Sequence, residues 1–305
     1  MKILLPSILA FLLLLGPQLY SQKLMPSSSA EPDTIPFRLT EYNNMVLQAV
    51  LNEVDSLDLM LHTAANDMTL IEAVRDRLKS VQYGHPDSVN SWGGKGSSRR
   101  SIGNQLLVGK QSWEEITIWE NKHSGQETDG KIGMDFFKGQ ILEINYEQNF
   151  IVVHPEMPER GADFEELAVE LQSGMRFLKG KIALGEESFE NSFLIHSGYA
   201  GSLLLDDAFA QGHRLDSRLE VIDEKILKDS YGNELKTLKA LVPSFQLGSI
   251  PFEQLPVGFF SGALGRQKIS VMGGDVLKRF NWIFDLKEER LFVRPNANLK
   301  LAYRE

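Results

Sequence analysis

Apolar and polar residues alternate through most of the chain after its first 34 residues. This period of two, rich in Val, Ile and aromatic residues, is the pattern of half-buried β-strands. Polar tetrads such as YEQN (146–149) and LKEE (286–289) separate neighbouring segments, as in hairpins. The clearest predicted strands are residues 44–51, 114–120, 141–146, 149–155, 176–184 and 290–295.

Helical spacing interrupts the β pattern once in each half. Residues 69–80 place apolar side chains at helical spacing after a Thr cap, and residues 203–212 form a shorter counterpart. The Gly- and Ser-rich residues 82–101 predict a long mobile loop, and residues 154–163 predict a linker. The chain is therefore predicted to be mostly β with short helices.

An internal repeat organises the chain. Residues 132–155 align without a gap with residues 272–295, and an upstream segment of each half aligns as well. Because the landmarks recur in the same order, we predict two similar lobes, residues 35–158 and 159–305. The matched positions include Gly133 with Gly273, and His62, Thr63 and Ala64 with His196, Ser197 and Gly198.

In each half, a strand ends in a triplet of the form X-Thr/Ser-Ala/Gly, and an apolar-Gly segment returns later. This arrangement resembles the aspartic protease superfamily, and most closely its retropepsin-like, two-lobed bacterial members. The resemblance spans residues 35–296 and implies two closed β lobes around a ligand cleft. It implies that Gly133 and Gly273 support the triplets from behind. It also implies that Thr63 and Ser197 form hydrogen bonds across the lobe junction.

The chain departs from this family at its most important positions. The resemblance places the catalytic Asp pair where this chain has His62 and His196, and Ala64 stands where the family has Gly. The family's chemistry needs two adjacent carboxylates that share one proton. Two imidazoles, mostly uncharged at neutral pH, do not reproduce it. We therefore expect no conventional aspartic peptidase activity.

Nearby carboxylates do not restore the pair. They do not recur at one place in both halves, so we expect them on the surface or at helix caps. They are Asp58, Asp67, Asp206 and Asp207.

Several roles remain open for His62 and His196. They can form a neutral N–H···N pair that ties the lobes together, in a cleft that binds a peptide, a protein or another extended ligand without cutting it. They can instead serve an atypical His- or metal-assisted hydrolase. We expect no cofactor, with Zn²⁺ held by the two histidines as the one alternative. No third ligand is apparent from spacing, and we expect the other histidines, His85, His123, His154 and His213, at the surface.

Trp92, in the Gly-rich run, is a further candidate for the ligand cleft, because the family places cleft-covering elements there. An ordinary loop anchored by one aromatic residue explains it equally well.

The N-terminus predicts export. Residues 1–22 hold one basic residue, an apolar run, a Gly-Pro break and a small residue near the end, which together predict a signal peptide. Residues 23–34 are Pro- and Ser-rich and predict a flexible leader. The chain has no Cys, which excludes disulfides and fits a bacterial periplasm or the cell exterior.

Charge and hydropathy restrict the partners. The net charge of -9, without any long basic block, argues against nucleic acid. No second long apolar run exists, so we expect no membrane association after signal cleavage. We expect a monomer.

Overall fold

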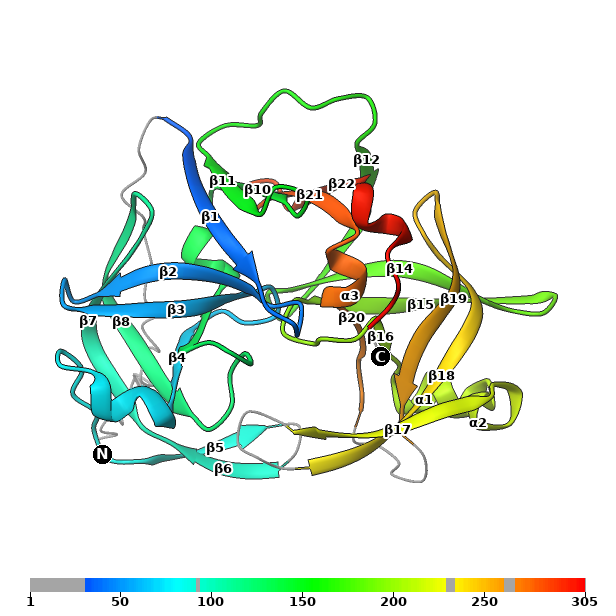
Figure 1. Cartoon of the computed structure of the whole chain (residues 1–305), viewed down its shortest axis with the longest axis horizontal. Helices are drawn as coiled ribbons and strands as arrows, with labels where there is room; N and C mark the ends of the chain where they lie inside the picture. The colour runs from blue at the N-terminus through cyan, green and yellow to red at the C-terminus, as the bar shows by residue number, and fades with distance from the viewer. Residues whose placement is uncertain (1–30, 92–93, 229–233, 261–266, 305) are drawn as a thin grey trace, which may run out of the picture.

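A computed structural model of the chain describes residues 31–91, 94–228, 234–260 and 267–304. The two halves form lobes at the left and right of Figure 1, and a sheet at the top joins them. The predicted signal peptide and Trp92 lie outside the described residues. Among the helices that are described, none is long and apolar enough to cross a membrane.

The first lobe is a closed ring of strands. β3 pairs antiparallel with β2 and parallel with β9, and the pairing of β7 with β2 closes the ring. In ring order its strands are β2 (Met45–Leu51), β3 (Asp55–His62), β9 (Gly130–Gly133), β4 (Met68–Ile71), β8 (Gln111–Asn121) and β7 (Arg100–Val108).

The second lobe repeats this ring. β15 takes the place of β3 and pairs parallel with β20, and the pairing of β14 with β18 closes the ring. In ring order its strands are β14 (Met175–Leu184), β15 (Glu187–His196), β20 (Ser270–Gly273), β16 (Leu203–Leu204), β19 (Ile250–Phe259) and β18 (Glu234–Leu247). β13 (Val169–Gln172) and β17 (Val221–Lys228) extend it, and α1 (Asp207–Gly212) and α2 (Leu215–Arg218) lie before β17.

A sheet built from both halves joins the lobes. Its centre is the antiparallel pair β10–β21, in which Ile144 lies opposite Trp282. In order its strands are β12 (Glu165–Leu167), β22 (Arg290–Pro295), β21 (Phe280–Asp285), β10 (Ile141–Asn145), β11 (Phe150–His154) and β1 (Asp33–Leu39). η2 (Met134–Phe137) leads into β10, α3 (Gly274–Leu277) leads into β21, and η3 (Ala297–Lys300) follows β22.

The alternating sequence explains the core. In β3, Leu57, Leu59 and Leu61 point into the first lobe and are at most 3% exposed. Each such side chain contributes about 2 kcal/mol of burial free energy. Trp113 packs edge-on against Phe136 at the base of the same lobe. The six predicted strands all form, as parts of β2, β8, β10, β11, β14 and β22.

The predicted helix at residues 69–80 is wrong at its start. Met68 and Leu70 are buried while Thr69 and Ile71 are only partly so, and this period of two makes β4. Helical geometry begins only at η1 (Glu72–Arg77), a 3₁₀ helix. In the second half, β16 likewise takes the start of the predicted segment, and α1 follows it.

Two predicted flexible segments are more regular than expected. Residues 82–101 contain a hairpin, β5 (Asp87–Ser91) with β6 (Gly94–Ser98), rather than only a loop. β1 begins at Asp33, inside the predicted leader. The Asp33 carboxylate accepts hydrogen bonds from the Lys110 backbone N–H at 2.8 Å and from Gln111 at 3.1 Å, which fixes the start of the strand.

Candidate functional site

The two histidines end equivalent strands of the two lobes. His62 is the last residue of β3 and lies opposite Gly133 of the parallel strand β9. His196 is the last residue of β15 and lies opposite Gly273 of the parallel strand β20. The identical register places both imidazoles at the junction of the lobes.

The two opposing glycines are required by the turns that follow the histidines. A Cβ at Gly133 would lie 2.2 Å from the carbonyl oxygen of Ala65, and one at Gly273 would lie 2.2 Å from that of Gly201. Any side chain there would displace the turn that carries the histidine. These glycines therefore position the site by close approach of two backbones.

Four hydrogen bonds tie the triplets together across the lobes. The Thr63 N–H donates to Ser197 Oγ at 3.0 Å, and the Ser197 N–H donates to Thr63 Oγ1 at 2.9 Å. Each hydroxyl then donates to a carbonyl of the opposite lobe, Thr63 to Ile195 at 2.8 Å and Ser197 to Leu61 at 2.7 Å. Each hydroxyl thus accepts one hydrogen bond and donates another within this network.

The imidazoles touch but do not share a proton. Their ring centroids are 4.5 Å apart and their planes make an angle of 69°, an edge-to-face contact. A direct N–H···N bond, one of the roles left open for this pair, does not form between these two described residues. Instead, the Ala64 N–H donates to His62 Nδ1 at 3.1 Å, which places the proton of neutral His62 on Nε2. His196 Nδ1 is buried without a hydrogen-bond partner.

Gly198 lets the two rings approach. A Cβ there would lie 2.5 Å from His62 Nε2 and 3.3 Å from His196 Cε1. The equivalent residue of the first lobe is Ala64, so the pair is not symmetric. Gly198 is the triplet residue over which the His62 ring lies.

Burial keeps both histidines uncharged. It lowers the pKa of His62 well below its usual value, with further lowering from His196 and from Lys131. Burial, followed by the charge of Lys131, lowers the pKa of His196 to about 4. At neutral pH the centre of the molecule therefore holds two neutral rings and a nearby ammonium group.

Lys131 is the residue that the sequence analysis missed. It lies on β9, and burial lowers its pKa to about 8, against the opposing effect of Asp67. The signal was present in the repeat, because the position equivalent to Lys131 in the second half is Val271. The two halves therefore differ at this position, with a cation in the first and an apolar residue in the second.

The carboxylates considered above as replacements for the missing Asp pair do not contact the histidines. Asp58 pairs with Arg38 at 3.1 Å on the outside of the first lobe. Asp206 caps α1 by accepting a hydrogen bond from the Phe209 N–H at 2.8 Å, as expected. Asp67 is close enough to interact with Lys131, and its pKa is raised by partial burial and by Asp135.

The other histidines lie elsewhere. His85 and His123 are exposed. His154 Nε2 lies 2.9 Å from a carboxylate oxygen of Glu143, and His213 packs against Phe189 with ring centroids 3.9 Å apart.

The site does not fit a zinc ion. Within the described residues, no group of three or more His, Cys, Asp or Glu is placed to hold a metal. One nitrogen of His62 is already occupied by the Ala64 N–H. The ammonium of Lys131, which lowers the pKa of both histidines, would also repel a dication. His62 and His196 thus offer two neutral donors in a positive field, which is too little for a stable site.

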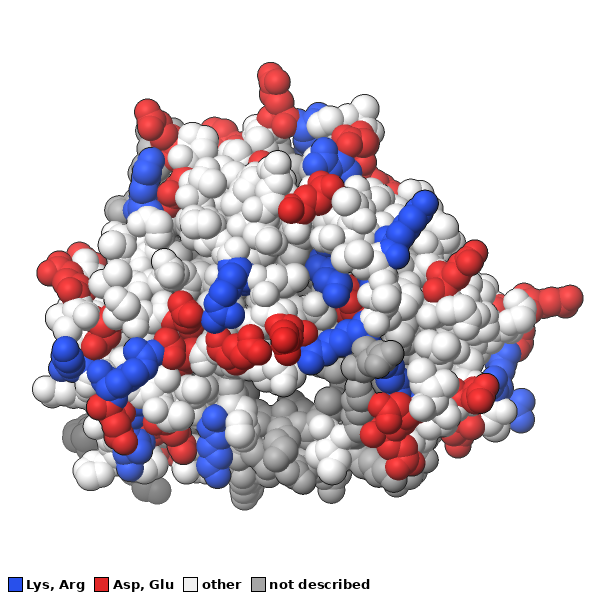
Figure 2. All heavy atoms as spheres, in the orientation of Figure 1, with Lys and Arg blue, Asp and Glu red and all other residues white. Residues whose placement is uncertain are grey.

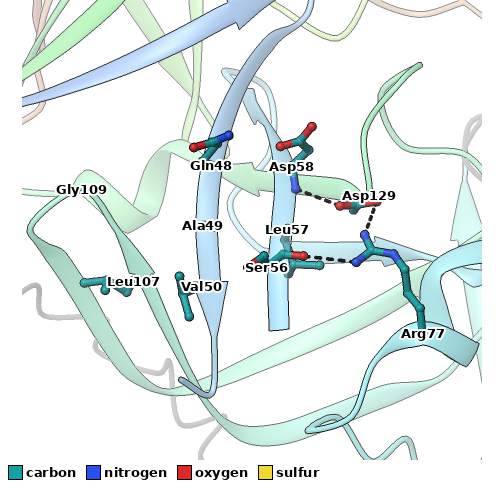
Figure 3. Close-up of a pocket in the computed structure, with 10 residues that line it drawn as sticks. All are labelled: Gln48, Ala49, Val50, Ser56, Leu57, Asp58, Arg77, Leu107, Gly109 and Asp129. Atoms are coloured by element: carbon teal, nitrogen blue, oxygen red, sulfur yellow. Dashed lines mark hydrogen bonds and ion pairs between the residues drawn. The ribbon is translucent and has the colours of Figure 1, made fainter. Parts of the chain in front are cut away.

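A cavity of about 480 Å³ lies on the outer side of β2 and β3, away from both histidines (Figure 3). Its polar groups satisfy one another: Arg77 pairs with Asp129 and donates to the Ser56 carbonyl at 3.1 Å. Asp129 in turn accepts from the Asp58 N–H at 2.8 Å. These bonds hold η1 and the segment before β9 against β3, which is a structural role.

Comparison with known proteins gives a fold and no more. No family model and no curated protein matches the sequence. Among solved structures, the chain is similar to an aspartic proteinase from Irpex lacteus, with a TM-score of 0.60 and 12% identity over 90% of this chain and 100% of that one. The predicted fold is confirmed: this chain has the two-lobed, mostly β fold seen in an aspartic proteinase.

Proposed function

We propose that this protein binds an extended peptide between its lobes without hydrolysing it. The observation that carries the proposal is the pair of neutral imidazoles at the ends of β3 and β15, at the junction of the two lobes. The hydrogen bonds and glycine contacts that support the two turns are present, while His62 and His196 stand where the resembled family has its acid–base pair.

The chemistry of the pair supports a binding role. A general base works best when its pKa lies near the working pH, and His196, with a pKa of about 4, is a weak base at neutral pH. In the described part of the chain, neither ring forms a hydrogen bond with a carboxylate that would orient it. Lys131 further disfavours the imidazolium that base catalysis would create.

The positions of two hairpins favour an extended ligand. β5–β6 follows η1 in the first lobe, and β17–β18 follows α1 and α2 in the second, so each lobe supplies one at the same place in the chain order. Both lie at the bottom of Figure 1, and Figure 2 shows a small opening above this lower edge of the molecule. A hairpin from each lobe favours the retropepsin-like arrangement as part of this proposal.

The test is retention of a degenerate octapeptide pool on the immobilised full chain, read by mass spectrometry. We expect intact peptides to be enriched. In Gly198→Val the added side chain would enter the space of the His62 ring. If this variant no longer enriches the peptides, they bind at this site. Gly212→Val serves as the control, since no atom lies within 4 Å of the added Cβ there. Equal retention by both variants would contradict the proposal.

One observation favours a second candidate, a His-based hydrolase. His196 Nδ1 is buried and has no hydrogen-bond partner within the described residues, so this ring nitrogen is left unused by the protein. Cleaved peptides in the same pool, lost in His196→Gln, would favour this alternative.

Export also remains a proposal, based on residues 1–22. The N-terminal sequence of the mature protein tests it, and cleavage near residue 22 is the expected result.

A further inference from the structure

We propose that Lys131 binds a carboxylate of the ligand beside the histidine pair. This rests on the proposed binding function and adds the chemical class that the cleft selects. The carboxylate belongs either to an acidic side chain or to the C-terminus of a peptide, and the experiment distinguishes the two.

Strand geometry places Lys131 beside the pair. Lys131 lies opposite Met60 in the parallel pairing of β9 with β3, two positions before Gly133 meets His62. Side chains two apart on a strand share a face, so Lys131 projects on the face of Met60 and His62. Its charge lowers the pKa of both histidines, which requires it to lie close to both.

The Lys131 ammonium lacks a direct partner. No ion pair or hydrogen bond to its Nζ is formed within the described residues. The side chain is half-buried, and an ammonium removed from water without a counterion is costly. Asp67 acts on it from beyond ion-pair distance, and Asp135 acts on Asp67. A ligand carboxylate would supply the missing contact.

The surroundings favour an anion at this position. The Nε2–H of His62 is a hydrogen-bond donor, because Nδ1 accepts from the Ala64 N–H. Both imidazoles are neutral, so the pair itself adds no negative charge to repel an incoming carboxylate. The second half has Val271 where the first has Lys131, so the site takes one carboxylate and not two.

The first experiment uses acetate as the probe and the full chain as the protein. The pKa of Lys131 is followed by NMR of its ¹³Cε in acetate and in acetamide at matched ionic strength. We expect acetate, and not acetamide, to raise this pKa from about 8. Lys110→Met, at an exposed lysine, is the control: it removes the Lys110 signal and should leave the acetate-induced change in the Lys131 pKa intact. An equal pKa in both solutions would overturn the inference.

The second experiment uses peptide pools that differ only in charge. Octapeptides carrying one Glu are compared with those carrying Gln, each with a free or an amidated C-terminus. We expect about tenfold stronger retention of one charged form, as a charge-assisted hydrogen bond provides. Preference for Glu identifies a side chain, and preference for the free terminus identifies a C-terminal carboxylate. Lys131→Met should abolish the preference, and Lys131→Arg should keep most of it.

The two proposals fail separately. Retention of peptides without any preference for charge, unchanged in Lys131→Met, overturns the carboxylate site and leaves peptide binding standing. Absence of retention contradicts peptide binding, while the acetate titration still decides whether Lys131 is an anion site. Circular dichroism of each variant confirms that it is folded before either comparison.

Discussion

At the residue scale, burial rather than a partner charge sets the protonation of His62 and His196. Each ring loses hydration on folding and gains no carboxylate in return, so the neutral form is favoured. The sequence predicted the pair from the repeat, because His62 and His196 occupy matched positions. It did not predict their contact geometry. The Ala64 N–H donates a hydrogen bond to His62 Nδ1, and this bond depends on the conformation of the turn.

This protonation makes stability depend on pH. The unfolded chain binds protons at its histidines near pH 6.5, while folded His196 binds one only near pH 4. The unfolded state therefore holds more protons in that window, and stability should fall as the pH decreases from 6.5 to 4. Between pH 7 and pH 4.5 we expect the double variant His62→Gln, His196→Gln to lose less unfolding free energy than the wild type, by at least about 2 kcal/mol, because His196 alone accounts for about that much and His62 adds to it.

Urea unfolding at a series of pH values measures this difference. His85→Gln, at an exposed histidine, is the matched control and should follow the wild type. Parallel curves for the wild type and the double variant would show that folding does not lower the pKa of either ring.

At the element scale, the site depends on close contacts between turns and strand ends. Period-two patterns predicted the strands well, because burial alternates along them. They did not predict β4, since Met68–Ile71 is short and runs directly into η1, so its apolar positions also match helical spacing. The hairpin β5–β6 was missed because Gly and Ser are also typical of loops.

Gly273, like Gly133, should tolerate no side chain behind the site. Gly273→Ala would place a Cβ 2.2 Å from the Gly201 carbonyl oxygen, and the turn would have to move. We expect a loss of about 3 kcal/mol or more in unfolding free energy. Gly212→Ala, where no atom lies within 4 Å of the added Cβ, should change it by less than about 1 kcal/mol. Thermal and urea unfolding measure both, and similar losses would contradict this explanation.

The crossed hydrogen bonds of Thr63 and Ser197 should act as one unit. Thr63→Val and Ser197→Ala each break bonds that the other residue also needs. We expect each to cost about 2 kcal/mol, and the double variant to cost clearly less than the sum. A double-mutant cycle by urea unfolding tests the coupling, with Thr63→Ser as the variant that keeps the hydroxyl. Additive losses would show that the two bonds are independent.

At the scale of the whole molecule, the repeat predicted two lobes, and the structure has them. The sequence did not predict how they join. β10 and β21 are both apolar and both lie in hairpins, and nothing in their pattern specifies that they pair with each other. The C-terminal segment was not singled out either, although it is fixed by a fully buried arginine.

Arg279 is this arginine, and it holds the C-terminal segment in place through hydrogen bonds. Its guanidinium is buried and donates to the carbonyls of Leu299 at 2.9 Å and Leu301 at 2.7 Å, and it lies 4.2 Å from the centre of the Tyr303 ring. We expect Arg279→Met to cost about 3–5 kcal/mol, because it leaves buried carbonyls unpaired. Arg294→Met, at a more exposed arginine, should cost less than about 1 kcal/mol.

Urea unfolding measures the two losses, and limited proteolysis should release the C-terminal segment only from Arg279→Met. Equal stability of the two variants would show that this segment is held by other contacts.

We propose that the paired imidazoles leave the junction of the lobes without hydrolytic activity. The most direct measurement is mass spectrometry of a degenerate octapeptide pool incubated with the purified full chain between pH 3 and pH 9. The prediction is an unchanged pool at every pH, with no difference between the wild type and His62→Gln, His196→Gln. New termini that form with the wild type and disappear with that double variant would contradict it.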